Sequence, residues 1–246
     1  FLLCEKTSSE EDNKKKIILM NDIQLEGVTV QLFDHFYGVF DGNGYTISGL
    51  SLVAGNTNTS LFGNNQGIIA NVGLKDVNVS SYYSGTVVAE YNYGSIVNVS
   101  VDTAEIAVIG FEDKGRFQKY SVITLSNHGL IQDVSINNVS FIVRDVSEDY
   151  AMQQVSMLSI DNGGLIQNAY VEQASINEPL FVDENCIISC EDRHDNYGDE
   201  TSENIYVSNA DSWDDYNLED VILSDLNSIG DFDLLDSLFV TPDSYL

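Results

Sequence analysis

The sequence predicts an all-β fold, a right-handed parallel β-helix of about six to seven rungs that ends in a small α-helical cap. The stretch GLIQ occurs twice, at 129–132 and at 164–167, inside a longer pattern that recurs along the chain. Short segments rich in β-branched residues, with alternating apolar positions, flank each copy of the pattern. Gly, Asn and Asp separate these segments, and all three tolerate left-handed backbone conformations. These observations together favour short parallel strands joined by tight turns.

The repeat has the form N-x-G-x-I-x-[ND]-[VA]-x-[LVI]. Its clear copies begin at Asn65, Asn92, Asn127 and Asn162, and a weaker copy begins at Asn196. Because a second apolar segment precedes each N-x-G, every unit is expected to hold a strand, a turn, a short strand, a polar corner and a further strand. Units this short cannot bury a face alone, so they must stack. An irregular β-sandwich, in which Asn-Gly turns recur by chance, is the alternative.

Stacking predicts columns of equivalent side chains. The inward column is expected to contain Ile69, Ile96, Ile131 and Ile166. A ladder of small or polar residues at the corner is expected to contain Asp22, Gly49, Asn71, Asn98, Asp133, Asn168 and Asn204, at intervals of 22 to 36 residues. The right-handed coil follows from the usual handedness of parallel crossovers.

The composition suggests three regions. Residues 1–16 are interpreted as the end of an N-terminal cap, 17–209 as the β-helix, and 210–246 as an acidic helical cap. In the last region Leu218, Val221 and Ile222 fall at helical spacing. Caps at both ends would keep the open rungs from pairing with other strands.

Three segments resemble the opening rungs of GLUG-motif proteins: IILMNDIQLEGV at 17–28, FYGVFDGNGYTISGLSL at 36–52 and SLFGNNQGIIANVGLKDVNV at 60–79. These are bacterial surface and secreted proteins with pectin-lyase-like β-helices, and the motif also occurs in some immunoglobulin A peptidases. The G-L-x-G strand is kept only in part, as LFG at 61–63. The resemblance implies an extracellular or cell-surface location and a structural motif without catalytic residues.

The charge of the chain limits its partners. A formal net charge of -29 argues against nucleic acid and anionic membranes, because both require clustered Lys and Arg. No apolar run is long enough to span a bilayer. The chain begins FLLCEK, without Met, and is interpreted as a segment of a larger protein. Cys4, Cys186 and Cys190 are expected to be unpaired, since residues four apart in a strand are too distant for a disulfide.

No catalytic residue and no required cofactor are predicted. A polysaccharide lyase would need a basic residue beside a carboxylate-bound Ca²⁺, and a hydrolase would need paired carboxylates. The histidines His35, His128 and His194 form no Ser–His–Asp pattern, and His128 is expected to be an exposed turn residue. A weak calcium site is conceivable at Glu191, Asp192, Asp195, Asp199 and Glu200, although a solvated acidic loop explains the same residues.

Insertions at 102–120, 142–154 and 177–186 fall at the same place in successive units and would form a wall of loops. The candidate binding residues on this wall are Phe111, Lys114, Arg116, Phe117, Tyr120, Tyr150 and Phe181. Aromatic loops suit host or environmental glycans or proteins. The sequence thus favours a non-catalytic surface module, adhesin-like or a rigid spacer. A polysaccharide-active β-helix enzyme and an accessory domain of a secreted protease are the alternatives.

Overall fold

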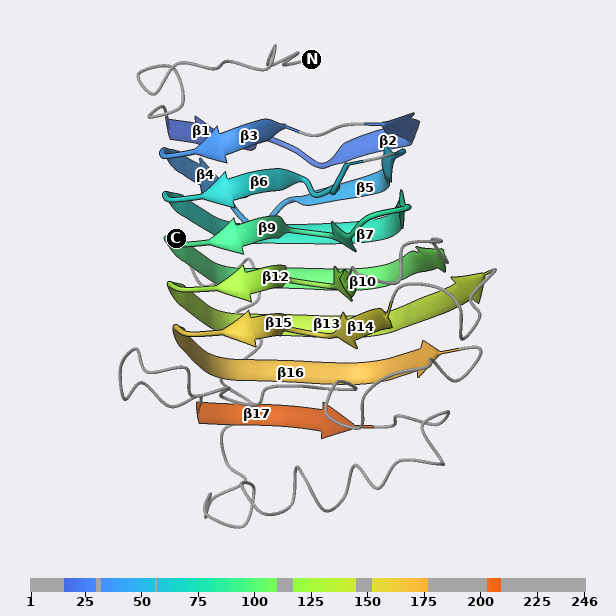
Figure 1. Cartoon of the computed structure of the whole chain (residues 1–246). Helices are drawn as coiled ribbons and strands as arrows, with labels where there is room; N and C mark the ends of the chain where they lie inside the picture. Colours follow the sequence, from blue (N-terminus) through green and yellow to red (C-terminus); the bar gives the residue numbers. More distant parts are fainter. Residues whose placement is uncertain are drawn as a thin grey trace.

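The structure, a computed structural model, describes residues 16–29, 32–55, 57–109, 117–144, 152–176 and 203–208. In these ranges all regular elements are strands, and they form three sheets in which the pairings are parallel. Figure 1 shows the strands stacked in sequence order, from blue to orange. The expected caps and the three cysteines lie outside the described residues, apart from Lys16, which begins β1.

The long sheet holds nine of the strands, in the order β1-β4-β7-β10-β13-β16-β17 with β2 and β5 beside this path. Its strands are β1 (Lys16–Ile18), β2 (Ile23–Thr29), β4 (Val39–Asp41), β5 (Thr46–Ala54), β7 (Ile68–Ser81), β10 (Ser95–Ile109), β13 (Leu130–Arg144), β16 (Leu165–Ile176) and β17 (Glu203–Ser208).

Two smaller sheets complete each turn of the chain. The second sheet contains β3 (Phe33–Phe36), β6 (Phe62–Asn65), β9 (Ala89–Asn92), β12 (Thr124–Asn127) and β15 (Ser159–Asn162). The third sheet contains β8 (Gly85–Thr86), β11 (Phe117–Ser121) and β14 (Met152–Ser156).

Strand numbers rise by three between neighbours, as in β6, β9, β12 and β15, so the chain returns to each sheet once per turn. This is the arrangement of a parallel β-helix of about five rungs. The number is lower than the six to seven that the sequence predicts. The outermost repeat copies give β1, β2 and β17 to the long sheet, without described partner strands in the other two sheets.

The core lies between the three sheets. The predicted inward column is confirmed: Ile96 pairs with Ile69 and Ile131, Ile131 pairs with Ile166, and all four are fully buried. Four phenylalanine rings pack together in the core of the N-terminal rungs, with centroids 4.9 to 5.8 Å apart in the pairs that touch. They belong to Phe33, Phe36, Phe40 and Phe62. The apolar periodicity of the repeat therefore becomes continuous columns of core residues.

The glycine of N-x-G is required by the closeness of neighbouring turns. A Cβ atom on Gly94 would overlap the carbonyl oxygen of Gly67, and a Cβ on Gly129 would overlap that of Gly94. The same holds for Gly67 against Gly38 and for Gly164 against Gly129. Since the obstacle is backbone, no side-chain rearrangement can relieve it, and this position accepts glycine alone.

The asparagine of N-x-G faces the interior and forms a hydrogen-bonded ladder. Asn65, Asn92, Asn127 and Asn162 are buried, and each Nδ2 of the first three donates to the Oδ1 of the next at 2.8 Å. The Oδ1 atoms of Asn65 and Asn127 also accept from the backbone N–H of the glycine two residues later. The sequence pattern indicated turns at these residues but did not predict this buried ladder.

The predicted corner ladder is confirmed in part. Asn71, Asn98, Asp133 and Asn168 have φ between 52° and 55°, and Asn204 lies opposite Asn168 in the register of β16 and β17. Asn98 donates to Asn71 at 2.9 Å, and Asn168 donates to Asp133 at 2.8 Å. These side chains are exposed or partly buried, so this corner faces outward.

Two members of the predicted ladder lie elsewhere. Ser48 pairs with Lys75, so the next residue, Gly49 (φ 73°), lies opposite Asp76. Both residues belong to a second corner of the coil where the backbone is left-handed. That corner continues through Thr103, Asn138 and Gln173, all with φ between 51° and 62°. Asp22 lies one residue before Ile23, the partner of Ile47, and its carboxylate accepts from the N–H of Thr46 at 2.8 Å.

Candidate functional site

The outer face of the second sheet gathers polar and aromatic side chains in register. His35, Asn64, Tyr91, Ser126 and Asp161 form one column across β3, β6, β9, β12 and β15. The first and last residues of these strands are buried, so the exposed part of the face comes from middle positions, although both middle residues of β12 are buried. Rungs repeat at about 4.8 Å, and a ligand lying along the axis would therefore meet a new side chain at each step.

A second column runs along the adjoining turns, at the variable position of N-x-G. It is occupied by Tyr37, Gln66, Tyr93, His128 and Gly163, and in the first of these turns Phe36 stands in place of the asparagine. The rings of Tyr93 and His128 stack with centroids 5.0 Å apart and an interplanar angle of 8°. Gln66 Nε2 donates to the Tyr37 hydroxyl at 3.3 Å. The prediction that His128 is exposed at a turn is confirmed. Because the Tyr93 and His128 rings stack on each other, each ring holds the other in one orientation.

We call this surface the tyrosine face; it consists of Tyr37, Glu90, Tyr91, Tyr93, His128 and Asp161. Tyr93 is 54% exposed and Tyr91 is 36% exposed. Partial burial raises the pKa of Tyr91, and the nearby Glu90, Tyr93 and Asp161 raise that pKa further. Since even the ordinary tyrosine pKa of about 10 lies well above neutral pH, the Tyr91 hydroxyl is protonated there and can donate a hydrogen bond to a ligand.

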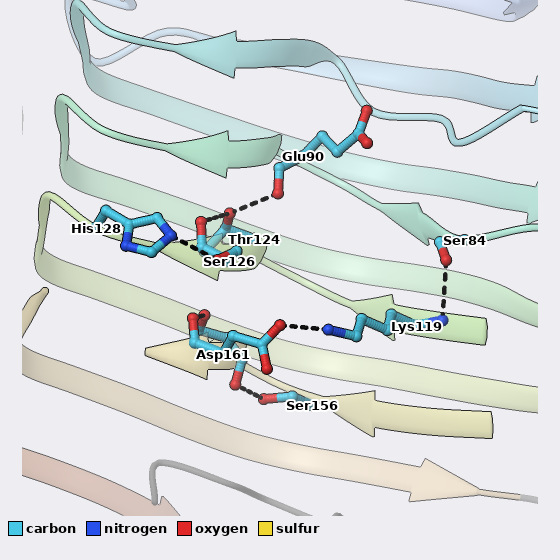
Figure 2. A network of polar contacts seen from close by, with 9 residues as sticks. Ser84, Glu90, Lys119, Thr124, Ser126, His128, Ser156 and Asp161 are labelled. Atoms are coloured by element: carbon cyan, nitrogen blue, oxygen red, sulfur yellow. Dashed lines mark hydrogen bonds and ion pairs between the residues drawn. The ribbon is translucent and has the colours of Figure 1, made fainter. Parts of the chain in front are cut away.

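The two carboxylates of the face have different partners. Asp161 forms an ion pair with Lys119, whose backbone N–H donates to the Ser84 hydroxyl at 3.0 Å. Figure 2 shows the Lys119 side chain reaching across the ribbon to Asp161. Glu90 accepts a hydrogen bond from Asn58 Nδ2. The face therefore offers one carboxylate neutralised by lysine and one bound to a neutral amide.

Two hydroxyl groups of β12 are buried next to this face, and their hydrogen bonds go to the protein. Thr124 Oγ1 is bonded to the Glu90 carbonyl at 3.2 Å, and Ser126 Oγ lies 3.1 Å from His128 Nε2 (Figure 2). In the part of the chain that the structure describes, no carboxylate hydrogen-bonds to the other ring nitrogen of His128. Among the described residues, this Ser–His pair therefore has no acidic partner of the kind that orients the base in a serine hydrolase.

The loop residues predicted to bind a ligand are not brought together by the described part of the structure. Tyr120 is fully buried and its hydroxyl donates to the Ser81 carbonyl at 2.8 Å, so its expected place on an exposed wall is wrong. Phe117 is described only as part of β11. The remaining candidates, Phe111, Lys114, Arg116, Tyr150 and Phe181, lie outside the described residues.

The weak calcium site lies outside the described residues too. Its residues Glu191, Asp192, Asp195, Asp199 and Glu200 all belong to the range 177–202, which the structure does not describe. Among the described residues, no group of three or more His, Cys, Asp and Glu side chains is placed to hold a metal ion. The same residues include no helix that is long and apolar enough to cross a membrane.

The sequence analysis did not predict the tyrosine face, because it interpreted the variable turn residue only as an exposed residue without a function. One signal was present: Tyr37, Tyr93 and His128 recur at that position in three of the turns. Rings repeated at one position of a stacked repeat must lie in one column.

A comparison with models of protein families gives no match, and comparisons with curated proteins and with solved structures give none either.

Proposed function

We propose that this chain is a non-catalytic β-helix module, exposed outside the cell, that binds saccharides through the tyrosine face. The observation that carries this proposal is the alignment of exposed tyrosine rings with carboxylates on one outer face of a rigid repeat. A tyrosine ring offers an apolar face to the C–H groups of a sugar and a hydroxyl to its polar edge. Carboxylates accept hydrogen bonds from sugar hydroxyls, and Asn and Gln amides both donate and accept.

The repeat architecture suits a polymeric ligand. Tyr37 and Tyr93 lie two rungs apart, a distance of about 10 Å along the axis, with Gln66 between them. The ladders of Asn65 to Asn162 hold the turns from the inside, so a ligand would meet a surface that needs little ordering. Since little conformational entropy of the protein is lost on binding, several weak sugar contacts can add up to a measurable affinity.

The resemblance of 17–28, 36–52 and 60–79 to GLUG-motif proteins supports the proposed location outside the cell. That family consists of surface and secreted bacterial proteins, and it would make the coil right-handed, as parallel crossovers usually are. A rigid repeat of this kind would also separate other parts of a larger chain, which is the spacer function considered from the sequence.

The test is a glycan array probed with the wild type, Tyr93→Ala and Tyr82→Ala. Tyr82 is a matched control, since it is 46% exposed but lies outside the tyrosine face. We expect Tyr93→Ala to weaken binding by about tenfold or more, and Tyr82→Ala to have no effect. Both variants should keep the wild-type melting temperature, because each removes an exposed side chain.

Three results would overturn the proposal. No glycan binding by the wild type would leave only the spacer function. Loss of binding in Phe117→Ala with Tyr150→Ala, but not in Tyr93→Ala, would place the site in the loops predicted from the sequence. Shortening of a bound polysaccharide would show that the module is an enzyme.

A further inference from the structure

We propose that the saccharide bound by the tyrosine face carries a protonated primary amine, held by the Glu90 carboxylate next to Tyr91. This inference rests on the proposed function and adds the chemical class of the ligand. A polymer containing glucosamine is the simplest saccharide of this kind.

The carboxylate of Glu90 differs from the other carboxylate of the tyrosine face and from two acids of the long sheet. Asp161 is paired with Lys119, Glu105 with Arg144, and Asp102 with Lys75. Within the described ranges, no Lys or Arg pairs with Glu90, which has the Asn58 amide as its partner. Glu90 is only partly exposed, so its negative charge is incompletely solvated. A cation that approaches it therefore gains more than it would at a fully exposed acid.

The neighbouring tyrosine ring also favours a positively charged group on the ligand. The face of a tyrosine ring is negative, and a cation within about 6 Å of its centre is attracted to it. Tyr91 follows Glu90 directly in β9 (Ala89–Asn92), and the two side chains are close enough for the Glu90 charge to raise the pKa of Tyr91. The raised pKa of Tyr91, caused first by burial and then by Glu90, agrees with a negative potential at this place.

The surrounding charges act in the same direction over a longer range. The formal net charge of the chain is -29, so a cationic ligand is attracted at low ionic strength and an anionic one is repelled. An acetylated amine carries no charge and keeps only the contacts of its ring and hydroxyl groups. Glucosamine units should therefore bind better than N-acetylglucosamine units of the same linkage and length.

The test compares glucosamine oligomers with fully N-acetylated oligomers of equal length, by calorimetry at low salt. We expect the free-amine oligomers to bind about tenfold tighter, and 0.5 M salt to remove most of that difference. Glu90→Gln should abolish the preference, so that the two oligomers bind with equal affinity. The side-chain carbonyl of the glutamine can still accept from Asn58, so the fold is retained. Glu105→Gln, an acid of the long sheet paired with Arg144, is the control and should keep the preference.

The outcomes separate this inference from the proposed function. Equal binding of both oligomers, lost in Tyr93→Ala, would overturn the amine preference and leave saccharide binding intact. Binding of neither oligomer, nor of other glycans, would overturn both. A lysine peptide that binds more tightly than the glucosamine oligomers would show that the amine belongs to a protein. A preference that survives Glu90→Gln would remove Glu90 from the site.

Discussion

Replacement of Asn127 by leucine removes the centre of the buried asparagine ladder. The Oδ1 of Asn127 accepts from Asn92 Nδ2 at 2.8 Å and from the Gly129 N–H at 3.3 Å. Its Nδ2 donates to Asn162 Oδ1 at 2.8 Å and more weakly to the Leu165 carbonyl at 3.5 Å. A leucine side chain has a similar volume and can form none of these bonds, so the substitution tests the ladder with little change in packing.

The expected cost follows from the groups that lose this partner. The Gly129 N–H and the Asn162 Oδ1 each lose a buried hydrogen bond, at about 1–3 kcal/mol apiece. Asn92 Nδ2 loses one bond but keeps its bond to the Leu130 carbonyl at 3.1 Å. Burial of the leucine returns about 1.5 kcal/mol. The net loss in the free energy of unfolding should therefore be about 0.5–4.5 kcal/mol.

Urea unfolding followed by circular dichroism measures this loss as a shift in the midpoint at constant slope. Asn78→Leu is the matched control, because Asn78 is an exposed residue of β7 (Ile68–Ser81) outside both ladders, and its stability should change by less than about 0.5 kcal/mol. Equal midpoints for Asn127→Leu and the wild type would refute the idea that the ladder stabilises the stack. Equal losses in both leucine variants would show that the effect is not specific to the ladder.

Three further predictions follow from the same structure. Gly94→Ala should destabilise the protein by about 3 kcal/mol, because its Cβ would meet the backbone of the rung before it, whereas Gly55→Ala, with open space around the Cβ, should be neutral in thermal unfolding. Burial raises the pKa of the Tyr120 hydroxyl in the folded state. The stability that this hydroxyl contributes is therefore present below about pH 10 and is lost as the pH rises further. In urea unfolding, the stability of Tyr120→Phe should fall less steeply above that pH than the stability of the wild type. Gln66→Tyr would extend the aromatic column next to Tyr93 and should raise saccharide affinity by a few-fold on calorimetry, with no change in melting temperature; unchanged affinity would argue against a ligand that lies along the turns.

The parallel stack and its inward column could be predicted from sequence because the repeat keeps a fixed frame. From the Asn to the Ile of the motif the spacing is constant, so Ile69 and Ile96 had to become neighbours once the units stacked. Period-two alternation then decided which side chains entered the core. Local rules of this kind need no knowledge of distant contacts.

The assignment of Gly49 failed for a reason that lies in the first rung. Between the pairs Asp41–Ala70 and Thr46–Gly73 the chain has four residues on one side and two on the other. The longer turn contains Asn43 and Gly44, both with positive φ, and shifts the rest of the rung along the sequence. A glycine fits either left-handed corner equally well, so sequence alone could not tell which corner Gly49 occupies.

The buried position of the motif asparagine was harder to foresee, because asparagine at a turn usually faces solvent. One residue carried the signal. Phe36 is in register with Asn65, and a phenylalanine that replaces asparagine at an equivalent position indicates an interior site. The aromatic rings of the first rungs thus fill the space that the amide ladder occupies in the later ones.

The N-x-G turn divides its three residues between structure and function. The asparagine is held inside by the ladder, and the glycine is required by the backbone of the rung before it. The middle residue is bound by neither constraint, since Gln66, Tyr93 and His128 occupy it in turns that otherwise match. Its backbone position is nevertheless fixed on both sides, so whatever side chain stands there is displayed in register with its neighbours. A stack of such turns can change its ligand by changing one residue per rung, without loss of the interactions that stabilise the fold.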